Sequence, residues 1–264
     1  MPNQSLIHDA EKGYNIEERL EETQQRAPII QTSPEQYERF LLASNRQKAH
    51  KFGNPAPLGL IAFILVQAPT AFIQMGWGGS SAAANAVLIG PYYLLGGLAL
   101  IISGVMEWVI GNTFPCVVSI TFGGNWLAVG TILDPAHGIA STFPDGASSP
   151  QYNKGLMFYF AFWTFLTAVY FVTSLRTNVA SAGVFFNITL ANGLNATAYG
   201  KMSNGDHDVA AALVKAGGAF EFVVVCIVAY SFVAMMLESV DMPLVLPLGD
   251  LSAIFRARRK AKLS

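Results

Sequence analysis

Charged side chains are gathered at the two ends of this 264-residue chain, and long apolar stretches fill the middle. Of its sixteen lysines and arginines, seven precede Asn54 and five follow Asp250, which leaves four for the roughly two hundred residues between them. With 12% charged residues, the chain carries about half the charged share of a soluble domain. This distribution predicts an all-α, polytopic membrane protein with two polar tails.

Six segments have the length and the low charge of a membrane-spanning helix. They cover residues 57–76, 88–111, 113–133, 154–174, 179–199 and 212–237. Three amides, Asn187, Asn192 and Asn195, interrupt the fifth segment. Such a window is either a loop or a helix that faces protein and water, and we favour the helix because no turn residues cluster within it.

The basic residues predict the orientation. Six spans place both tails on one side, which then holds most of the lysines and arginines and is therefore cytoplasmic. We expect a largely disordered cytoplasmic tail at 1–52, a six-helix transmembrane domain at 53–248 and a basic cytoplasmic tail at 249–264. The first fifty residues lack the apolar core of a signal peptide, so the first span is expected to direct insertion.

The first span begins with the motif Asn54-Pro55-Ala56-Pro57-Leu58-Gly59-Leu60. Proline suits the first turn of a helix because its missing N–H is not needed there and its φ is already helical. The Asn54 side-chain oxygen can cap the same turn. Glycines and serines later in the chain, such as those at 96, 97, 104 and 123, are expected to let helix backbones approach closely.

Two carboxylates, Glu107 and Glu221, fall within the predicted spans, where a charge is costly and therefore marks a functional candidate. Glu107 lies near the cytoplasmic end of the second span. It is either an interfacial group tied to helix ends or a group that titrates and controls a gate. We expect Glu221 to face a wet cavity or a subunit interface.

Neutral amides and aromatic rings are the other candidates for a pathway. Five amides could hold a small carboxylate weakly enough to release it, as conduction requires: Asn54, Asn112, Asn125, Asn187 and Asn192. Phe63 and Phe122 lie away from helix ends, which suits a hydrophobic constriction or ordinary core packing. The sequence shows no phosphate-binding loop, metal-ligand cluster or nucleophile elbow, so we predict no enzyme, no metal or other cofactor and no nucleic-acid partner.

Three motifs in order resemble the acetate uptake transporter family of bacteria, archaea and fungi. They are the motif from Asn54 to Leu60, the stretch Gly104–Phe114 with its acid-aromatic-GNTF pattern, and Lys215-Ala216-Gly217-Gly218 before the sixth span. The long N-terminal tail resembles the fungal branch. The resemblance implies six helices per protomer and a ring-shaped homo-oligomer, a homohexamer, with a pore in each subunit.

The same resemblance implies site residues. The family's narrowest point is a hydrophobic ring from the first, third and fifth helices, to which Phe63, Phe122 and Leu190 would correspond, with Leu194 as the alternative to Leu190. The family often has a tyrosine at the second position, so Phe122 lacks a hydroxyl. Glu221 departs from the family, which commonly has a small residue there.

We therefore expect transport of acetate and related short-chain monocarboxylates, with a proton, across the plasma membrane. Asn54 and Glu107 would form the cytoplasmic vestibule. An acetate-sensing membrane protein and an ammonium exporter are the alternatives. The expected pathway residues are Asn54, Phe63, Glu107, Asn112, Phe122, Asn125, Asn187 and Leu190.

Overall fold

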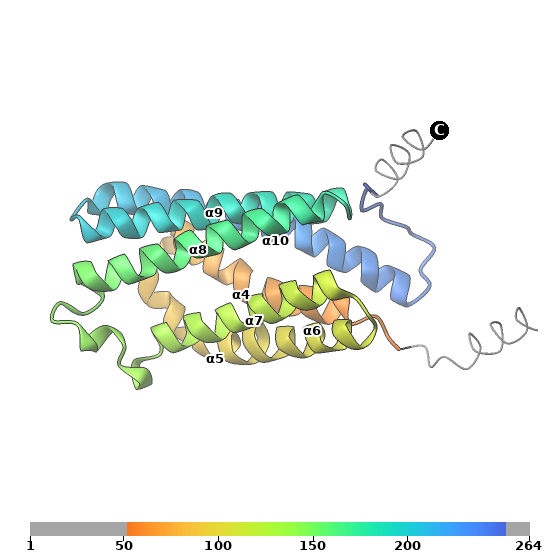
Figure 1. The fold of residues 1–264 in the computed structure, drawn as a ribbon, viewed down its shortest axis with the longest axis horizontal. Helices are drawn as coiled ribbons and strands as arrows, with labels where there is room; N and C mark the ends of the chain where they lie inside the picture. Colours follow the sequence, from red (N-terminus) through yellow and green to blue (C-terminus); the bar gives the residue numbers. More distant parts are fainter. Residues whose placement is uncertain (1–51, 252–264) are drawn as a thin grey trace, which may run out of the picture. The chain divides into compact units, whose positions relative to one another are not determined.

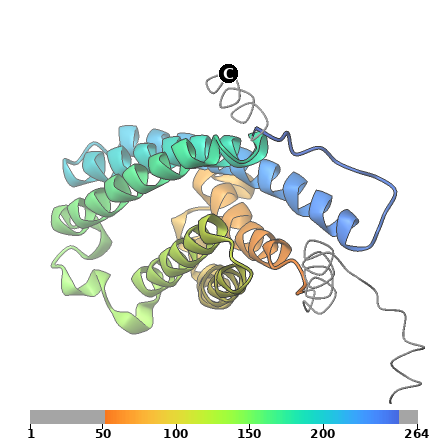
Figure 2. The same ribbon diagram turned by 45° about the vertical axis from the view of Figure 1, so that its right-hand side comes forward.

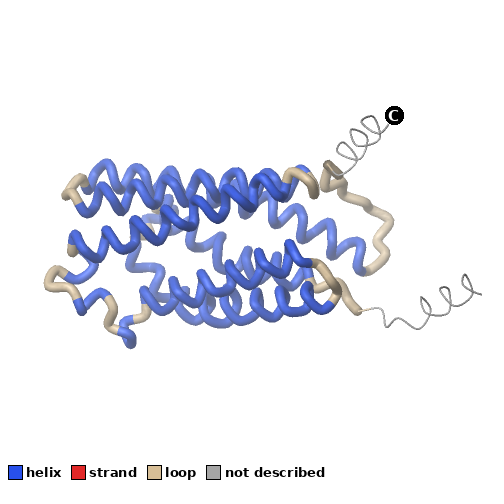
Figure 3. Tube along the Cα trace, viewed as in Figure 1, coloured by secondary structure: helices blue, strands red, loops and turns tan. Residues whose placement is uncertain are grey.

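The computed structural model describes residues 52–251, and within that range the regular structure is entirely helical (Figures 1 and 3). The predicted terminal tails lie mostly outside the described residues. The long helices are α4 (Ala56–Met75), α6 (Leu100–Val109), α7 (Thr113–Leu133), α8 (Pro150–Ser174), α9 (Val179–Ser203) and α10 (His207–Ser239). A 3-10 turn at Ala82–Leu88, the short α5 (Ile89–Pro91) and a π-helical segment at Tyr92–Ala99 lead directly into α6.

Five stretches within the described residues are long and apolar enough to cross a membrane. They are α4, Ala82–Val109, α7, α8 and α10. The prediction of a polytopic, all-α membrane protein is therefore confirmed. The predicted fifth span does form a helix, α9, and this helix is as long as α8. Its amides lower its hydropathy, so a sixth crossing stays a prediction.

A tight turn joins α6 to α7 at Gly111, whose φ of 88° is available to glycine at little cost. Because of this turn, α6 and α7 run side by side and antiparallel. Glycines let the pair approach closely. A Cβ on Gly97 would lie 2.3 Å from Leu127 Cδ2, and one on Gly123 would lie 3.0 Å from the Gly97 carbonyl oxygen. The predicted role of these small residues in close packing is thus confirmed.

Helices α8, α9 and α10 form a second group, with α9 packed against both of the others. Helix α4 lies between this group and the α6–α7 pair and contacts α10 on one side and α6 with the π-helical segment on the other (Figure 2). The buried core clusters around α4, with Val66 of α4, Tyr92 of the π-helical segment and Val224 of α10 fully buried.

One end of the helices gathers the start of α4, the α6–α7 turn, the α8–α9 turn and the end of α10 (Figure 1). The segment after α10 returns across this end and pairs with the α8–α9 turn. The Val179 N–H donates to the Gly249 carbonyl at 2.8 Å, and the Leu251 N–H donates to the Thr177 carbonyl at 3.0 Å. The charge distribution predicts that this end faces the cytoplasm.

Candidate functional site: a cavity at the start of α4

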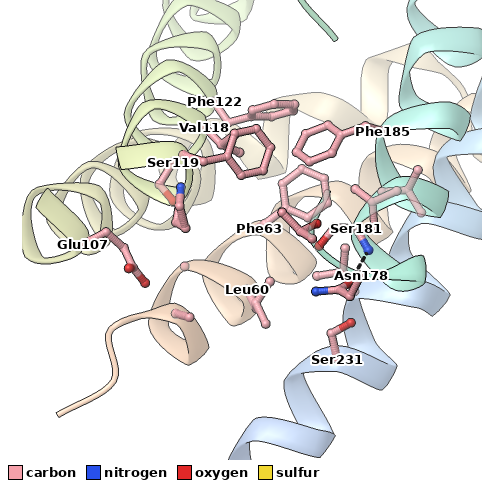
Figure 4. Close-up of a pocket in the computed structure, with 18 of the residues that line it drawn as sticks. Leu60, Phe63, Glu107, Val118, Ser119, Phe122, Asn178, Ser181, Phe185 and Ser231 are labelled. Carbon is pink, nitrogen blue, oxygen red and sulfur yellow. Dashed lines mark hydrogen bonds between the residues drawn. The ribbon is translucent and has the colours of Figure 1, made fainter. Parts of the chain in front are cut away.

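A cavity of about 300 Å³ lies at this end, between α4, α6, α7, α9 and α10 (Figure 4). Most of its wall is apolar, and none of the described residues that line it is a lysine or an arginine. Its polar wall residues are Glu107, Ser119, Thr177, Asn178, Ser181 and Ser231. Such a wall offers hydrogen bonds to a small ligand without a fixed positive charge that would hold an anion tightly.

The cavity ends at a cluster of buried apolar side chains that we call the inner cluster. It consists of Phe63, Phe122, Phe185, Ile188 and Val224. Four of these are the deepest wall residues on α4, α7, α9 and α10. Phe63 meets Phe122 edge-on, with ring centroids 5.9 Å apart, and Figure 4 shows both rings turned toward Phe185. The structure therefore brings the two predicted constriction residues together.

The structure brings neither Leu190 nor the alternative, Leu194, to the inner cluster, because neither residue lines the cavity. The Leu190 side chain is 37% exposed. Ile188 takes that place on α9. A step of two residues turns about 200° around an α-helix, so Leu190 points away from the face that carries Ile188. The assignment of α9 to the constriction fits the structure, whereas the assignment of this particular leucine does not.

Glu107 is buried, with 2% of its surface exposed, and lines the cavity near its outer end. The Asn112 side-chain N–H donates to the Glu107 carboxylate at 2.7 Å, and the Asn112 backbone N–H donates to the Glu107 carbonyl at 2.9 Å. Asn112 is thus a partner of Glu107 across the α6–α7 turn. This contact matches the interpretation of Glu107 as a group tied to helix ends, while a role in titration stays a prediction.

The motif at the start of α4 positions the cavity wall. The Ala56 N–H donates to Asn54 Oδ1 at 3.0 Å, which confirms the predicted cap. Ser103 of α6 donates to the Pro55 carbonyl at 3.0 Å. A Cβ on Gly59 would lie 2.8 Å from Ser103 Oγ, so this glycine permits the contact between α4 and α6.

None of the five predicted amides lines the cavity, and the amide that does line it, Asn178, was not predicted. Asn125 accepts a hydrogen bond from the Tyr159 hydroxyl at 2.8 Å in a separate, open groove between α7 and α8. Asn187 donates to the Gly183 carbonyl of its own helix at 2.8 Å. Asn192 is buried in α9 but does not line the cavity. Hydropathy and residue type cannot assign a helix face, and the face decides which amide meets the cavity.

A second polar cluster, deeper than the cavity, surrounds Glu221. Its carboxylate is 5% exposed and lies between α4, α9 and α10 of a single chain, rather than at a wet cavity or a subunit interface. Gln67 Nε2 donates to it at 2.7 Å, Gln74 Nε2 at 3.0 Å and Asn195 Nδ2 at 3.1 Å. Neither glutamine was among the predicted site residues. Their spacing of seven residues, two helical turns, was the available signal.

Among residues 52–251, no three histidine, cysteine, aspartate or glutamate side chains are close enough together to hold a metal ion. The cavity and the Glu221 cluster are therefore the polar features to compare with known proteins.

A family model described as the GPR1/FUN34/yaaH family matches residues 40–253 of the chain. The chain belongs to the GPR1/FUN34/yaaH family. The family resemblance seen in the three sequence motifs is thereby confirmed, and the apolar helices of this family member make it a membrane protein.

Relatives within the GPR1/FUN34/yaaH family include "Protein alcS" of Aspergillus fumigatus, 34% identical over 88% of this chain and 89% of the relative. "Acetate permease A" of Emericella nidulans is 30% identical over 81% of this chain and 72% of the relative. "Ammonia transport outward protein 2" of Saccharomyces cerevisiae is 30% identical over 76% and 69%.

A solved structure, that of the bacterial acetate channel SatP, superposes on the family member described above with a TM-score of 0.61 and 25% identity. The match covers 75% of this chain and all of the SatP chain. The helical arrangement around α4 is therefore shared with a protein whose structure was determined as an acetate channel.

Proposed function

We propose that this protein carries acetate and related short-chain monocarboxylates across the plasma membrane, together with a proton, through a pore in each subunit. The observation that carries the proposal is the cavity at the start of α4, which ends at the inner cluster. The choice of substrate is supported by the similarity of the chain to an acetate channel in fold and to an acetate permease in sequence. The protein is a transporter on this proposal, and not an enzyme.

The chemistry of the cavity suits a small monocarboxylate. Its hydroxyl and amide side chains can hydrogen-bond a carboxylate weakly, and the inner cluster excludes water from the deepest part. An ion that crosses such a cluster must lose its hydration, which costs more for a charged group than for a neutral one. Asn54 and Glu107 are proposed to guide the substrate at the cytoplasmic mouth, with Phe63 and Phe122 as the gate.

The arrangement in the membrane belongs to the same proposal. We propose that α9 is the sixth span, so that both termini are cytoplasmic, and that the subunits form a ring-shaped homohexamer. The amides of α9 support this assignment, because Asn195 bonds to Glu221 and Asn187 to its own backbone, which satisfies polar groups that lipid could not.

Flux through purified protein in liposomes tests the function. Radiolabelled acetate should enter protein-containing vesicles faster than protein-free ones, and an inside-alkaline pH gradient should drive its accumulation. Acetate binding without flux would instead favour the sensing alternative. Flux of ammonium in the absence of acetate flux would favour the export alternative, to which the ammonia-transport relative gives some weight.

A further inference from the structure

The Glu221 cluster lies directly beyond the inner cluster on the same helix faces. Gln67 follows Phe63 by four residues on α4, and Glu221 precedes Val224 by three residues on α10. Residues three or four apart lie above one another on a helix. The carboxylate therefore lies about one helical turn beyond the inner cluster, on the side away from the cavity.

The bonds to Glu221 suit an ionised carboxylate. Three neutral amides, Gln67, Gln74 and Asn195, donate to its two oxygens at 2.7, 3.0 and 3.1 Å. The charge of Glu221 acts on two tyrosine hydroxyls, those of Tyr92 on the π-helical segment and Tyr199 of α9. A buried carboxylate held by neutral donors has the partners to stay charged, yet it carries a charge that would repel an arriving anion.

The same cluster also suits the protonated acid. Gln74 Oε1 is buried and has no hydrogen-bond partner. Rotation of the Gln74 amide by half a turn would exchange its N–H₂ for this oxygen, which could then accept the O–H of a protonated Glu221. Gln74 Oε1 could therefore accept a hydrogen bond when Glu221 is protonated, and it has no hydrogen-bond partner when Glu221 is ionised.

A line of hydroxyl groups leads from the cluster toward the opposite end of the bundle. Thr70, which lies between Gln67 and Gln74 along α4, is 2.8 Å from the Tyr92 hydroxyl. Tyr92 donates to Asn85 Oδ1 at 3.1 Å, and Asn85 lies in the 3-10 turn between α4 and α5. Thr70 also donates to the Val66 carbonyl of its own helix at 2.7 Å. These hydroxyls lie on the same side of the inner cluster as Glu221, which is the side from which its carboxylate would have to regain a proton.

We propose that Glu221 protonates the substrate immediately before it enters the inner cluster. In this step the Glu221 carboxylic acid gives its proton to a carboxylate oxygen of the arriving monocarboxylate. The products are a neutral carboxylic acid and an ionised Glu221, which the three amide donors stabilise. The neutral acid crosses between the phenylalanines and loses its proton to water in the cavity, while Glu221 regains one from the opposite side.

The inference rests on the proposed function and explains its proton coupling. One proton accompanies each substrate because the inner cluster passes only the neutral form.

Glu221→Gln is the first test, because it keeps the size of the side chain but removes the proton. We expect acetate uptake at neutral pH, driven by an inside-alkaline gradient, to fall about a hundredfold, as is typical when a positioned acid is lost. Glu221→Asp should restore part of the uptake. Glu238→Gln, on an exposed carboxylate at the far end of the same helix, is the matched control and should transport like the wild type.

A second test uses the wild-type protein and so does not depend on the folding of a variant. Acetate, fluoroacetate and difluoroacetate are similar in size but increasingly reluctant to accept a proton. Uptake should fall along this series if Glu221 must protonate the substrate.

The results that would overturn the inference are distinct from a failure of the proposed function. Wild-type uptake and pH dependence in Glu221→Gln, or rates that do not vary along the fluorinated series, would overturn the role of Glu221. Equal loss of uptake in folded Glu221→Gln and Glu221→Asp would also overturn it, because a merely structural role predicts that result. Absence of acetate flux in the wild-type protein would refute the transport function itself.

Discussion

At the scale of single residues, Phe122 of α7 contacts aromatic rings of both α4 and α8. Its ring meets Phe63 of α4 on one side and Trp163 of α8 on the other, at centroid distances of 5.9 and 5.3 Å. The side chain is 8% exposed, so its packing and its place at the end of the cavity are inseparable. A substitution here must therefore be judged by stability and by transport together.

Phe122→Ala should widen the inner cluster and let larger monocarboxylates, such as butyrate, enter at rates closer to that of acetate. The cavity left behind should also cost about 3–5 kcal/mol of unfolding free energy. Competition of unlabelled acids against labelled acetate measures the first effect, and thermal unfolding in detergent measures the second.

Phe162→Ala is the matched control, because this ring lies on α8 but is 74% exposed. It should change neither the selectivity nor the rate of uptake. An unchanged order of preference in Phe122→Ala would contradict the place of Phe122 in the gate.

At the scale of helices, contact between α6 and α7 depends on glycines whose missing side chains leave room for the neighbouring backbone. Two adjacent glycines of α7 differ in this respect. A Cβ on Gly123 would lie 2.6 Å from Ile101 Cγ1 and 3.1 Å from the Ile101 backbone nitrogen, whereas one on Gly124 would meet nothing within 4 Å.

Gly123→Ala should therefore lower the stability of the protein by about 1–3 kcal/mol, because the two helices must separate to admit the methyl group. Gly124→Ala, its neighbour, should leave the unfolding temperature nearly unchanged. The two variants can be compared by thermal unfolding of the detergent-solubilised protein. Equal effects would mean that the close approach of α6 and α7 is not what stabilises the pair.

At the scale of the whole molecule, exposed apolar side chains indicate where lipid or another subunit contacts the helices. On α8 a stripe of exposed apolar side chains repeats at helical spacing: Phe158, Phe162, Phe165, Val169 and Val172. A face of this kind is stable only against hydrocarbon or another apolar surface.

The proposed topology places the α7–α8 connection outside the cell and the end of α10 inside. In a background without the two native cysteines, Ser148→Cys should react with a membrane-impermeant thiol reagent in intact cells. Ser239→Cys, at the other end of the helices, should react only after the cells are permeabilised. The reverse pattern would contradict the assignment of both termini to the cytoplasm.

The proposed homohexamer should appear in native mass spectrometry of the protein released from lipid nanodiscs, as a species with six times the chain mass. A monomer in nanodiscs that still transports acetate would contradict the need for a ring.

The sequence by itself determined five of the six predicted spans, the start of α4 and the family, because each depends on local composition or on a short motif. Apolar length sets a membrane helix, and the cap of Asn54 on Ala56 involves residues two apart. Phe63 and Phe122 were also predicted to lie together at a constriction, because each follows a family motif along the chain.

Only the tertiary structure decided which face of each helix meets the others. It replaced Leu190 by Ile188 at the inner cluster, and it moved Asn125 and Asn187 away from the cavity. It also joined Gln67 to Glu221, 154 residues apart in the chain, around a carboxylate that the sequence left without partners. In apolar helices of this kind, hydropathy is high on every side, so the rotation of each helix is fixed by packing and by the pairing of a few buried polar groups.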